Sequence, residues 1–505
     1  MKKRLSLALS LFALFPLLEA LPASAASRAV WLVAAGKTDI TPDLAHETIW
    51  LAGFGASGRK PTGIHDHLYA RALLVSDGRK TVALVAVDTI GLYRRDVQDM
   101  RREAGWTGPN RYLFVSATHS HSTPDSLGLW GRFPGVSGVN KRYRESIIKA
   151  VANLVKTLDK NLKPARFYAA ETDVNPAGLC RDSRDPVVID PELDVLQFRG
   201  LKPPTKTIGT LVRWSCHPEV MWDDNYEVSA DYPGVLCKTV EDKTGGACVF
   251  QSGVIGGLLT PDVDRKGGPP QEIKDMDRVG TTLADDALRI IAKAKPIAPP
   301  SVSFSSRTLL VPVENSRYLL LLPHLTYGHR VFGKDGKPMP KWMTYWIPLK
   351  QMLFFPISKA QEPRVKTEIA LVRLGPVEIL GVPGELFPEL AIGGYDGRYR
   401  FGHPLIKPNN PNPPDLARAP KGPYLRQELH ARVGIIVGLA NDELGYIVPN
   451  YDFKISDTRL MLPRLPGDHY EETNSIGPSA THILMDAYRK MLAGEASRAA
   501  VSKFK

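Results

Sequence analysis

Short, continuous apolar runs recur along the chain and predict strands that are buried on both faces. They lie at residues 81–87, 112–117, 210–216, 247–252, 377–382 and 433–439. Between them, residues 142–158 and 274–293 carry apolar side chains at helical spacing, which predicts amphipathic helices that pack on a sheet. The pattern predicts an α/β fold, with a mixed, multi-stranded β-sheet core flanked by helices.

Histidines and a carboxylate stand where several of these predicted strands end. The run at 112–117 stops at His119 and His121, and residues two apart on an extended chain point to the same side. A single short element can supply two ligands of one metal ion in this way, although polar residues can equally close a strand and make a turn. His217 follows another predicted strand, and Glu385 a third. Because open α/β sheets bind ligands at strand ends, the pattern favours a metal site there.

Two further features allow a structural and a functional interpretation. His65 and His67 form a second His-x-His pair, but they precede a predicted strand, which favours a structural or substrate-contacting role. Residues 319–355 are rich in apolar and aromatic side chains without clear periodicity. Such a segment either packs over a core or forms a lid that lines an acyl pocket.

The N-terminus has the pattern of an export signal. Basic residues at positions 2–4 precede the apolar run at 5–18, and the small residues at 23–25 suit a cleavage site. We therefore expect residues 1–25 to be a signal peptide and the mature chain, 26–505, to be periplasmic or secreted. No later apolar run reaches the roughly 18 residues of a membrane span. We expect no transmembrane segment, and at most peripheral contact with membrane lipid.

Charge changes this picture little. The formal net charge is +12, but the basic residues are dispersed along the chain and no nucleic-acid-binding module is visible. We interpret the excess as an ordinary basic surface in an envelope rich in anionic lipid and polysaccharide, and expect no nucleic-acid partner.

The cysteines leave their pairing open. Cys180, Cys216, Cys237 and Cys248 permit disulfides in an oxidising compartment, and Cys237 and Cys248 are nearest in sequence. Proximity in sequence does not establish a bond. None shows Cys-x-x-Cys spacing, so a cysteine zinc site is not expected.

Short motifs occur along the chain in the order in which they occur in one known family. They are Asp39-Ile-Thr-Pro, Gly63-Ile-His, Ala70-Arg-Ala, Thr118-His-Ser-His-Ser-Thr-Pro, Ser215-Cys-His, Ala230-Asp-Tyr-Pro-Gly, Val382-Pro-Gly-Glu, Gly438-Leu-Ala-Asn and Tyr470-Glu. In this joint order the chain resembles the N-terminal catalytic domain of the neutral, or alkaline non-lysosomal, ceramidases, from about Trp31 to about Tyr488.

The resemblance implies one zinc ion and a set of residues around it. Carried over by position, the implied ligands are His119, His217, Glu385 and Tyr446. The resemblance also suggests His121 and Tyr470 as groups that face the scissile amide, and Arg181 as a substrate contact. Nitrogen and oxygen ligands suit Zn²⁺, and an open position permits Lewis-acid hydrolysis by zinc-activated water. His121 or Tyr470 would then donate a hydrogen bond to the developing oxyanion.

Two departures from the family pattern bear on the chemistry. Ceramidases place a serine, proposed as nucleophile, in a Gly-Asp-x-Ser-Pro-Asn stretch, and the corresponding stretch here is Gly257-Leu-Leu-Thr-Pro-Asp. Thr260 keeps a hydroxyl, but its branched side chain is more restricted, so activated water is the expected nucleophile and Thr260 the alternative. Ceramidases also continue into an immunoglobulin-like domain, which we do not expect within 26–505.

These observations predict an exported zinc-dependent amidohydrolase. We expect it to cleave the N-acyl amide bond of ceramide or of another N-acylated amine or lipid. A zinc esterase, lactonase or glycan-directed hydrolase on the same scaffold is the alternative. A non-catalytic, metal-stabilised binding protein of the envelope is a third hypothesis.

Overall fold

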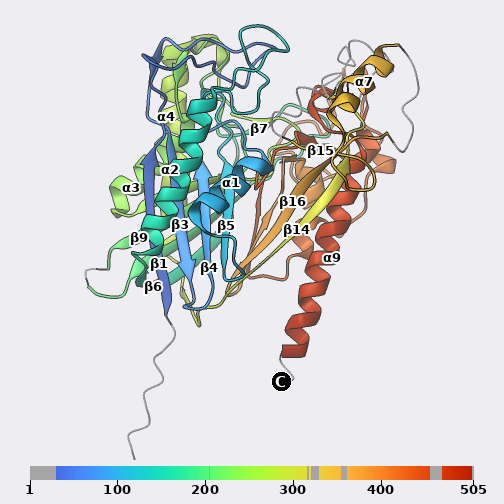
Figure 1. Ribbon diagram of the computed structural model, residues 1–505. Coiled ribbons are helices and arrows are strands. Elements are labelled where there is room, and N and C mark those ends of the chain that lie inside the picture. The colour runs from blue at the N-terminus through green and yellow to red at the C-terminus, as the bar shows by residue number, and fades with distance from the viewer. Residues whose placement is uncertain are drawn as a thin grey trace, which may run out of the picture.

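Two β-sheets packed face to face form the centre of the structure (Figure 1). The structure, a computed structural model, describes residues 30–203, 205–315, 318–319, 329–353, 361–454 and 469–502. The predicted signal peptide, residues 1–25, lies outside the described residues, and so do residues 320–328 and 354–355 of the aromatic segment.

The larger sheet is mixed, as the apolar runs predict. Its strands follow the order β11-β9-β8-β6-β1-β3-β4-β5, with β13 beside β6. They are β1 Trp31–Asp39, β3 Tyr69–Ser76, β4 Thr81–Val87, β5 Arg111–Ala117, β6 Lys163–Asp173, β8 Glu192–Gly200, β9 Thr207–Trp214, β11 Ala247–Ser252 and β13 Pro296–Ile297. β4 pairs with β5, and β9 with β11, in parallel, whereas the other pairs are antiparallel. Because β4 and β5 are parallel, their carboxyl ends meet at one edge.

The smaller sheet supplies the opposite wall of the core. Its order is β14-β16-β17-β19, with β15 beside β16. The strands are β14 Val302–Pro312, β15 Val331–Phe332, β16 Arg364–Leu374, β17 Val377–Gly381 and β19 Val433–Val437. Between the sheets, Leu73 and Phe114 of the larger one belong to the same buried cluster as Ile379 and Ile435 of the smaller one.

Helices cover the outer face of each sheet, which gives four layers (Figure 1). On the larger sheet lie α1 Arg94–Ala104, α2 Lys141–Asp159, α3 Asp231–Thr244 and α4 Pro269–Ile291, and on the smaller one α8 Pro388–Ile392 and α9 Ser479–Ser502. Ile147 and Val151 of α2 bury against the larger sheet, and Leu484 of α9 against the smaller one. The helices predicted at 142–158 and 274–293 are confirmed as α2 and α4.

Short elements close the edges. Three two-stranded pairs are β2 Gly63–Ile64 with β10 Glu227–Val228, β7 Arg181–Asp182 with β12 Leu259–Thr260, and β18 Glu385–Leu386 with β20 Tyr446–Ile447. The 3-10 turns are η1 Arg265–Gly267, η2 Leu416–Arg418, η3 Leu425–Glu428, η4 Asn450–Asp452 and η5 Glu471–Asn474.

The described part of the aromatic segment contains one further helix, α7 Lys341–Met352. Ile347 of α7 is buried in a cluster with Val311 and Val365, which agrees with packing over a core. Trp342 and Tyr345 instead lie exposed on the opposite side of the helix. Among the described helices, none combines the length and the apolar character that crossing a bilayer requires.

All four cysteines are buried free thiols in the structure. Cys180 lies within hydrogen-bonding range of Cys216, and Cys237 of Cys248. The cysteines that are neighbours in space therefore form these two pairs. The spacing of the cysteines in the sequence did not decide between the possible pairings.

Candidate functional site

The first histidine of the site is held by the turn that follows β5. The backbone N–H of His119 donates to the carbonyl of Thr89 at 2.9 Å, and its φ of +69° lies in the left-handed region, where residues with a side chain are uncommon. The Nδ1–H of His119 donates to the carbonyl of Ile90 at 2.5 Å, because a carbonyl can only accept. Burial lowers the pKa of His119 to about 4, so the ring is neutral at neutral pH and Nε2 keeps its lone pair.

A second imidazole is oriented in the same way after β9. The backbone N–H and the Nδ1–H of His217 both donate to the carbonyl of Leu259, at 2.7 and 2.8 Å. The other ring nitrogen, Nε2, lies 3.0 Å from Oε2 of Glu385. Two separate strand ends thus present Nε2 atoms to the same carboxylate.

That carboxylate comes from β18, which pairs with β20 so that Glu385 stands opposite Tyr446. Its Oε2 also lies 3.7 Å from Nε2 of His119. Burial alone would raise the pKa of Glu385, but His119, His217 and a hydrogen bond from Tyr446 hold it below its ordinary value. Glu385 is therefore a charged carboxylate that faces two imidazole nitrogens.

A metal cation fits this arrangement. Burial would lower the pKa of His217, but Glu385 and Glu219 raise it to about 9, which favours a positive charge between His217 and Glu385. A metal ion at the same position would supply that charge and use both Nε2 lone pairs as donors. Neutral imidazoles and a carboxylate are ligands that suit zinc. The structure brings together His119, His217, Glu385 and Tyr446, the ligands that the family resemblance implies.

The third histidine, His121, extends the cluster. Its ring centroid lies 5.1 Å from that of His119 and 5.6 Å from that of His217. One ligand nitrogen of each of these three rings lies within 4.8 Å of the others. Among the described residues, neither nitrogen of His121 makes a well-aligned hydrogen bond, although Nδ1 lies 3.2 Å from Oε2 of Glu219. The ring can therefore act as a further ligand or face the substrate, and the second role stays a prediction.

Close neighbours fix the ring of His121. A Cβ at Gly53, whose φ is +98°, would lie 2.4 Å from Cγ of His121, so only glycine leaves room for the imidazole. Phe54 packs edge-on against the ring with centroids 4.9 Å apart. Nη2 of Arg59 donates to the carbonyl of His121 at 2.6 Å.

Glu219 joins the site although the sequence did not single it out as a functional residue. Its Oε2 lies 3.2 Å from Nδ1 of His121, and it accepts a hydrogen bond from the hydroxyl of Thr260. Thr260 and Arg181 face each other across β12 and β7. Neither Thr260 nor Arg181 lines the pocket that opens beside the histidines, which is described next. The one signal for Glu219 in the sequence is its position two residues after His217.

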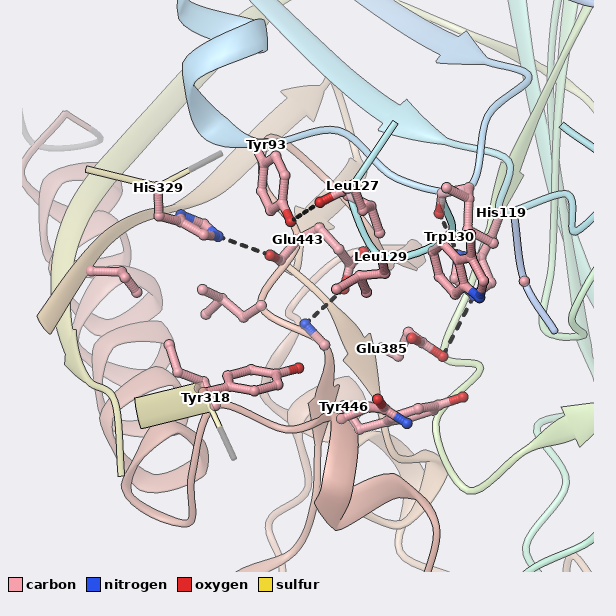
Figure 2. A pocket seen from close by; sticks show the side chains of 18 of the residues that line it. Tyr93, His119, Leu127, Leu129, Trp130, Tyr318, His329, Glu385, Glu443 and Tyr446 are labelled. Atoms are coloured by element: carbon pink, nitrogen blue, oxygen red, sulfur yellow. Dashed lines mark hydrogen bonds and ion pairs between the residues drawn. The ribbon is translucent and has the colours of Figure 1, made fainter. Parts of the chain in front are cut away.

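A pocket of about 1050 Å³, including the space that opens to solvent, extends from the cluster. His119, His121, Glu385, Tyr446 and Tyr470 line one part of it. The apolar part is lined by Tyr93, Leu127, Leu129, Trp130, Val365, Leu444 and Ile476. Figure 2 shows His119 and Glu385 on one side of the pocket and Tyr93 and His329 on the other. The cluster therefore faces a space that suits a substrate with an apolar chain.

Known proteins resemble this chain in sequence and in fold. Residues 31–262 match the model of the family described as neutral/alkaline non-lysosomal ceramidase, N-terminal. The chain is 24% identical over 284 residues to a neutral ceramidase of Pseudomonas aeruginosa, covering 52% of this chain and 41% of that protein. It is 24% identical over 300 residues to a neutral ceramidase of Mycobacterium tuberculosis, covering 52% and 46%. The matched segments thus span less than half the length of these curated relatives.

Solved structures show the same fold. The crystal structure of neutral ceramidase from Pseudomonas aeruginosa superposes with a TM-score of 0.61 at 16% identity, covering 92% of this chain and 73% of that one. A ceramidase complexed with C2 gives a TM-score of 0.63 at 15% identity, covering 93% and 76%. The predicted mixed α/β architecture is confirmed, and so is the resemblance to the family.

Proposed function

We propose that this chain is a zinc-dependent hydrolase of N-acyl amide bonds, on the ground that its residues 31–262 match the family model of the neutral/alkaline non-lysosomal ceramidases. The observation that carries the proposal is the meeting of three groups beside an apolar pocket, two of which, His119 and Glu385, line it. These are Nε2 of His119, Nε2 of His217 and the carboxylate of Glu385.

Four residues are the proposed zinc ligands, and two backbone carbonyls orient the histidines among them. In the proposed enzyme, His119, His217, Glu385 and Tyr446 hold the zinc ion, which when bound supplies Lewis-acid activation of the amide carbonyl and of water. The carbonyls of Ile90 and Leu259 fix the tautomers of the two histidines, because each accepts from Nδ1–H. Such outer partners typically raise metal affinity or activity roughly 10- to 100-fold.

His121 and Glu219 form the proposed proton-handling pair. His121 lines the pocket, whereas Glu219 contacts the imidazole from outside the pocket lining. Glu219 can therefore accept a proton through the imidazole of His121, or hold that imidazole in its orientation. Tyr470 also lines the pocket, and its hydroxyl is the proposed donor to the oxyanion. Thr260 remains the alternative nucleophile, with Glu219 as its base. Its position outside the pocket lining favours water instead.

The shape and chemistry of the pocket support an acylated substrate. Its apolar part adjoins the cluster directly, so a hydrocarbon chain can lie against Leu127 and Trp130 while the amide reaches Glu385. Ceramide and other N-acylated amines or lipids are the proposed substrates, and Arg181 remains a proposed contact with them. An ester with the same chain would fit the same apolar wall, which keeps the esterase as the second candidate.

Turnover and metal content test the function together. We expect the purified protein to contain about one zinc ion per chain and to hydrolyse long-chain N-acyl amides. A chelator should remove the activity and added zinc should restore it. Mass spectrometry of products and of bound metal makes both measurements. Full activity without zinc, or cleavage of esters alone, contradicts the proposal.

Export is part of the same proposal. The basic and apolar pattern of residues 1–25 supports a signal peptide and a periplasmic or secreted product, with 26–505 as a single hydrolase domain. The mass of the mature protein tests this, since an uncleaved N-terminus contradicts it.

Helix α7 supports peripheral contact of the enzyme with a lipid surface. Trp342 and Tyr345 are 63% and 66% exposed, and Trp346 is exposed on the same side. Lys341 and Lys350 belong to the same helix. Exposed tryptophan and tyrosine beside lysine are typical of a helix that lies in the interface of an anionic membrane.

Vesicle binding tests this contact. We expect Trp342→Ser combined with Trp346→Ser to lower co-sedimentation with anionic vesicles by about tenfold, because two interfacial side chains are lost. Phe133→Ser is the matched control, since Phe133 is 59% exposed and distant in sequence from α7. If vesicle binding falls equally in the double variant and in the Phe133 variant, or does not fall in the double variant, α7 does not contact the lipid surface.

A further inference from the structure

Three carboxylates stand together at one end of the core between the two sheets. Glu171 of β6 lies opposite Asp194 of β8, and Glu192 stands two residues before Asp194 on the same strand. Leu196 of β8 and Ala169 of β6 belong to the core between the sheets. Because residues two apart on a strand point to the same side, the three carboxylates continue the inner face of the larger sheet. One oxygen of each carboxylate lies within 4.8 Å of the others.

Asp194 is the buried member of this acidic cluster, the name used below for Glu171, Glu192 and Asp194. Asp194 is 0% exposed, and among the described residues neither of its oxygens accepts a hydrogen bond. Nη1 of Arg213 lies 3.5 Å from its Oδ2, without the alignment of a hydrogen bond. Oε1 of Glu192 has no hydrogen-bond partner either, although Nη2 of Arg426 lies 3.3 Å away. Buried carboxylate oxygens in this state destabilise a fold unless a ligand pairs with them.

The two neighbouring arginines donate their hydrogen bonds elsewhere. Nη2 of Arg213 and both terminal nitrogens of Arg426 donate to Asp190. The remaining nitrogens of Arg213, Nε and Nη1, donate to the backbone carbonyls of Ile436 and Glu192. Asp190 is therefore well paired, whereas the side chains of the acidic cluster are not.

The balance of charge points to the same missing partner. The two guanidinium groups face four carboxylates, those of Asp190 and of the acidic cluster, so two negative charges are left over. The next charges outward, Asp173 and Arg432, act on Glu171 in opposite directions. Burial raises the pKa of Asp194 to about 7, although both guanidinium groups lower it. A divalent cation would supply the charge that the protein lacks here.

We propose that Glu171, Glu192 and Asp194 bind a calcium ion that stabilises this end of the core. Oxygen donors without nitrogen or sulfur suit a hard cation. Ca²⁺ binds oxygens at about 2.3–2.6 Å, so oxygens on opposite sides of one ion lie roughly 5 Å apart, which agrees with the spacing of the cluster. Mg²⁺ demands near-ideal octahedral geometry and loses its water reluctantly, so carboxylates fixed on two strands suit the more adaptable Ca²⁺.

The position of the cluster gives the ion both access and a structural role. Glu171 is exposed, so the ion can enter from solvent and keep water ligands on that side. Oε2 of Glu171 accepts from the backbone N–H of Gly434 in β19 at 3.3 Å, so the cluster reaches the smaller sheet. None of the three carboxylates lines the pocket beside His119 and Glu385. The proposed ion therefore holds the two sheets together and is independent of the proposed hydrolysis.

Calcium content and calcium titration test the site in the whole protein, with its other metal left in place. After dialysis against calcium-free buffer, the calcium that the wild type retains and the calcium that it takes up from CaCl₂ in calorimetry should together reach about one ion per chain. About a hundredfold excess over the dissociation constant should raise Tm by about 4 °C above the calcium-free value. MgCl₂ should bind at least about tenfold more weakly.

Variants of the cluster locate the ion. Glu171→Gln and Glu192→Gln should each weaken calcium binding by about tenfold or more, because each removes a charged ligand. Glu171 is exposed, so its variant is the one least affected in folding. Glu145→Gln is the matched control, since Glu145 is an exposed glutamate of α2, and it should keep the calcium affinity and the rise in Tm of the wild type.

The outcomes that overturn the inference do not depend on enzyme activity. A wild type that neither retains nor takes up calcium overturns it, whether or not the variants fold. Wild-type calcium affinity in both Glu171→Gln and Glu192→Gln overturns it as well, because the ion then lies elsewhere. Equal affinity for MgCl₂ overturns the assignment to calcium. Absence of amide hydrolysis removes the proposed function and leaves the calcium result unchanged.

Discussion

Replacing His217 by alanine should remove zinc and lower kcat/KM for amide hydrolysis by on the order of 10³-fold. The expected loss exceeds the roughly 10- to 100-fold cost of losing an outer partner, because a ligand itself disappears. His217 is fully buried, and its Nε2 is the nitrogen nearest to Glu385, at 3.0 Å. Its loss leaves the Glu385 carboxylate with His119 and Tyr446 but without its nearer imidazole. Metal analysis and steady-state kinetics of the purified variant measure both effects.

The control comes from the second His-x-His pair. Nδ1 of His67 lies 2.6 Å from Oδ2 of Asp39, and the side chain of His67 is 62% exposed. His67→Ala should therefore keep the zinc content and the rate of the wild type. A thermal melt distinguishes loss of metal from loss of fold. Wild-type zinc content and activity in a folded His217→Ala variant would falsify the proposed centre.

The strand-end argument located the centre of this site for a physical reason. A buried strand is followed by a polar turn, and His119 and His217 stand in the turns directly after β5 and β9. Their ring centroids lie 5.1 Å apart in the folded chain. The resemblance to a family added Tyr446, which no apolar pattern marks. It reaches the site because β20 pairs with β18 and places it opposite Glu385.

Other parts of the site depend on contacts that no local pattern contains. Glu219 meets His121 only because the segments after β9 and β5 come together, where the N–H of His121 donates to the carbonyl of Pro218 at 3.1 Å. The need for glycine at position 53 depends on the imidazole that passes over it. Periodicity describes what one element buries, not which elements meet.

The same limit applies to the fold. Amphipathic spacing identified α2 and α4 to within a few residues, and the run Pro269-Pro270 after Gly268 explains where α4 begins. The division of the strands into two sheets was not predicted. Buried strands of either sheet carry similar apolar side chains, so β4 and β17 cannot be assigned to different sheets from their residues alone.

Replacing Arg213 by methionine should lower the free energy of unfolding by about 3–5 kcal/mol, as breaking a buried ion pair does. Arg213 of β9 is fully buried. Its Nη2 donates to Oδ2 of Asp190 at 2.5 Å, and its Nε donates to the carbonyl of Ile436 in β19 at 2.9 Å. One guanidinium thus joins the two sheets and compensates a buried carboxylate. Urea denaturation at neutral pH measures the loss, and Arg289→Met on the exposed face of α4 should change stability by less than about 0.5 kcal/mol.

The pH dependence separates the lost charge from lost packing. Burial would raise the pKa of Asp190, but Arg213 and Arg426 hold it below its ordinary value of 3.8. In the wild type this group therefore stabilises the fold above pH 3.8, and the contribution fades only as the pH falls further. Without Arg213 the pKa of Asp190 rises, so the variant is penalised most at neutral pH and recovers as protonation neutralises the carboxyl group. The gap between wild type and variant should narrow from pH 7 toward pH 4, whereas a defect of packing alone would leave it constant.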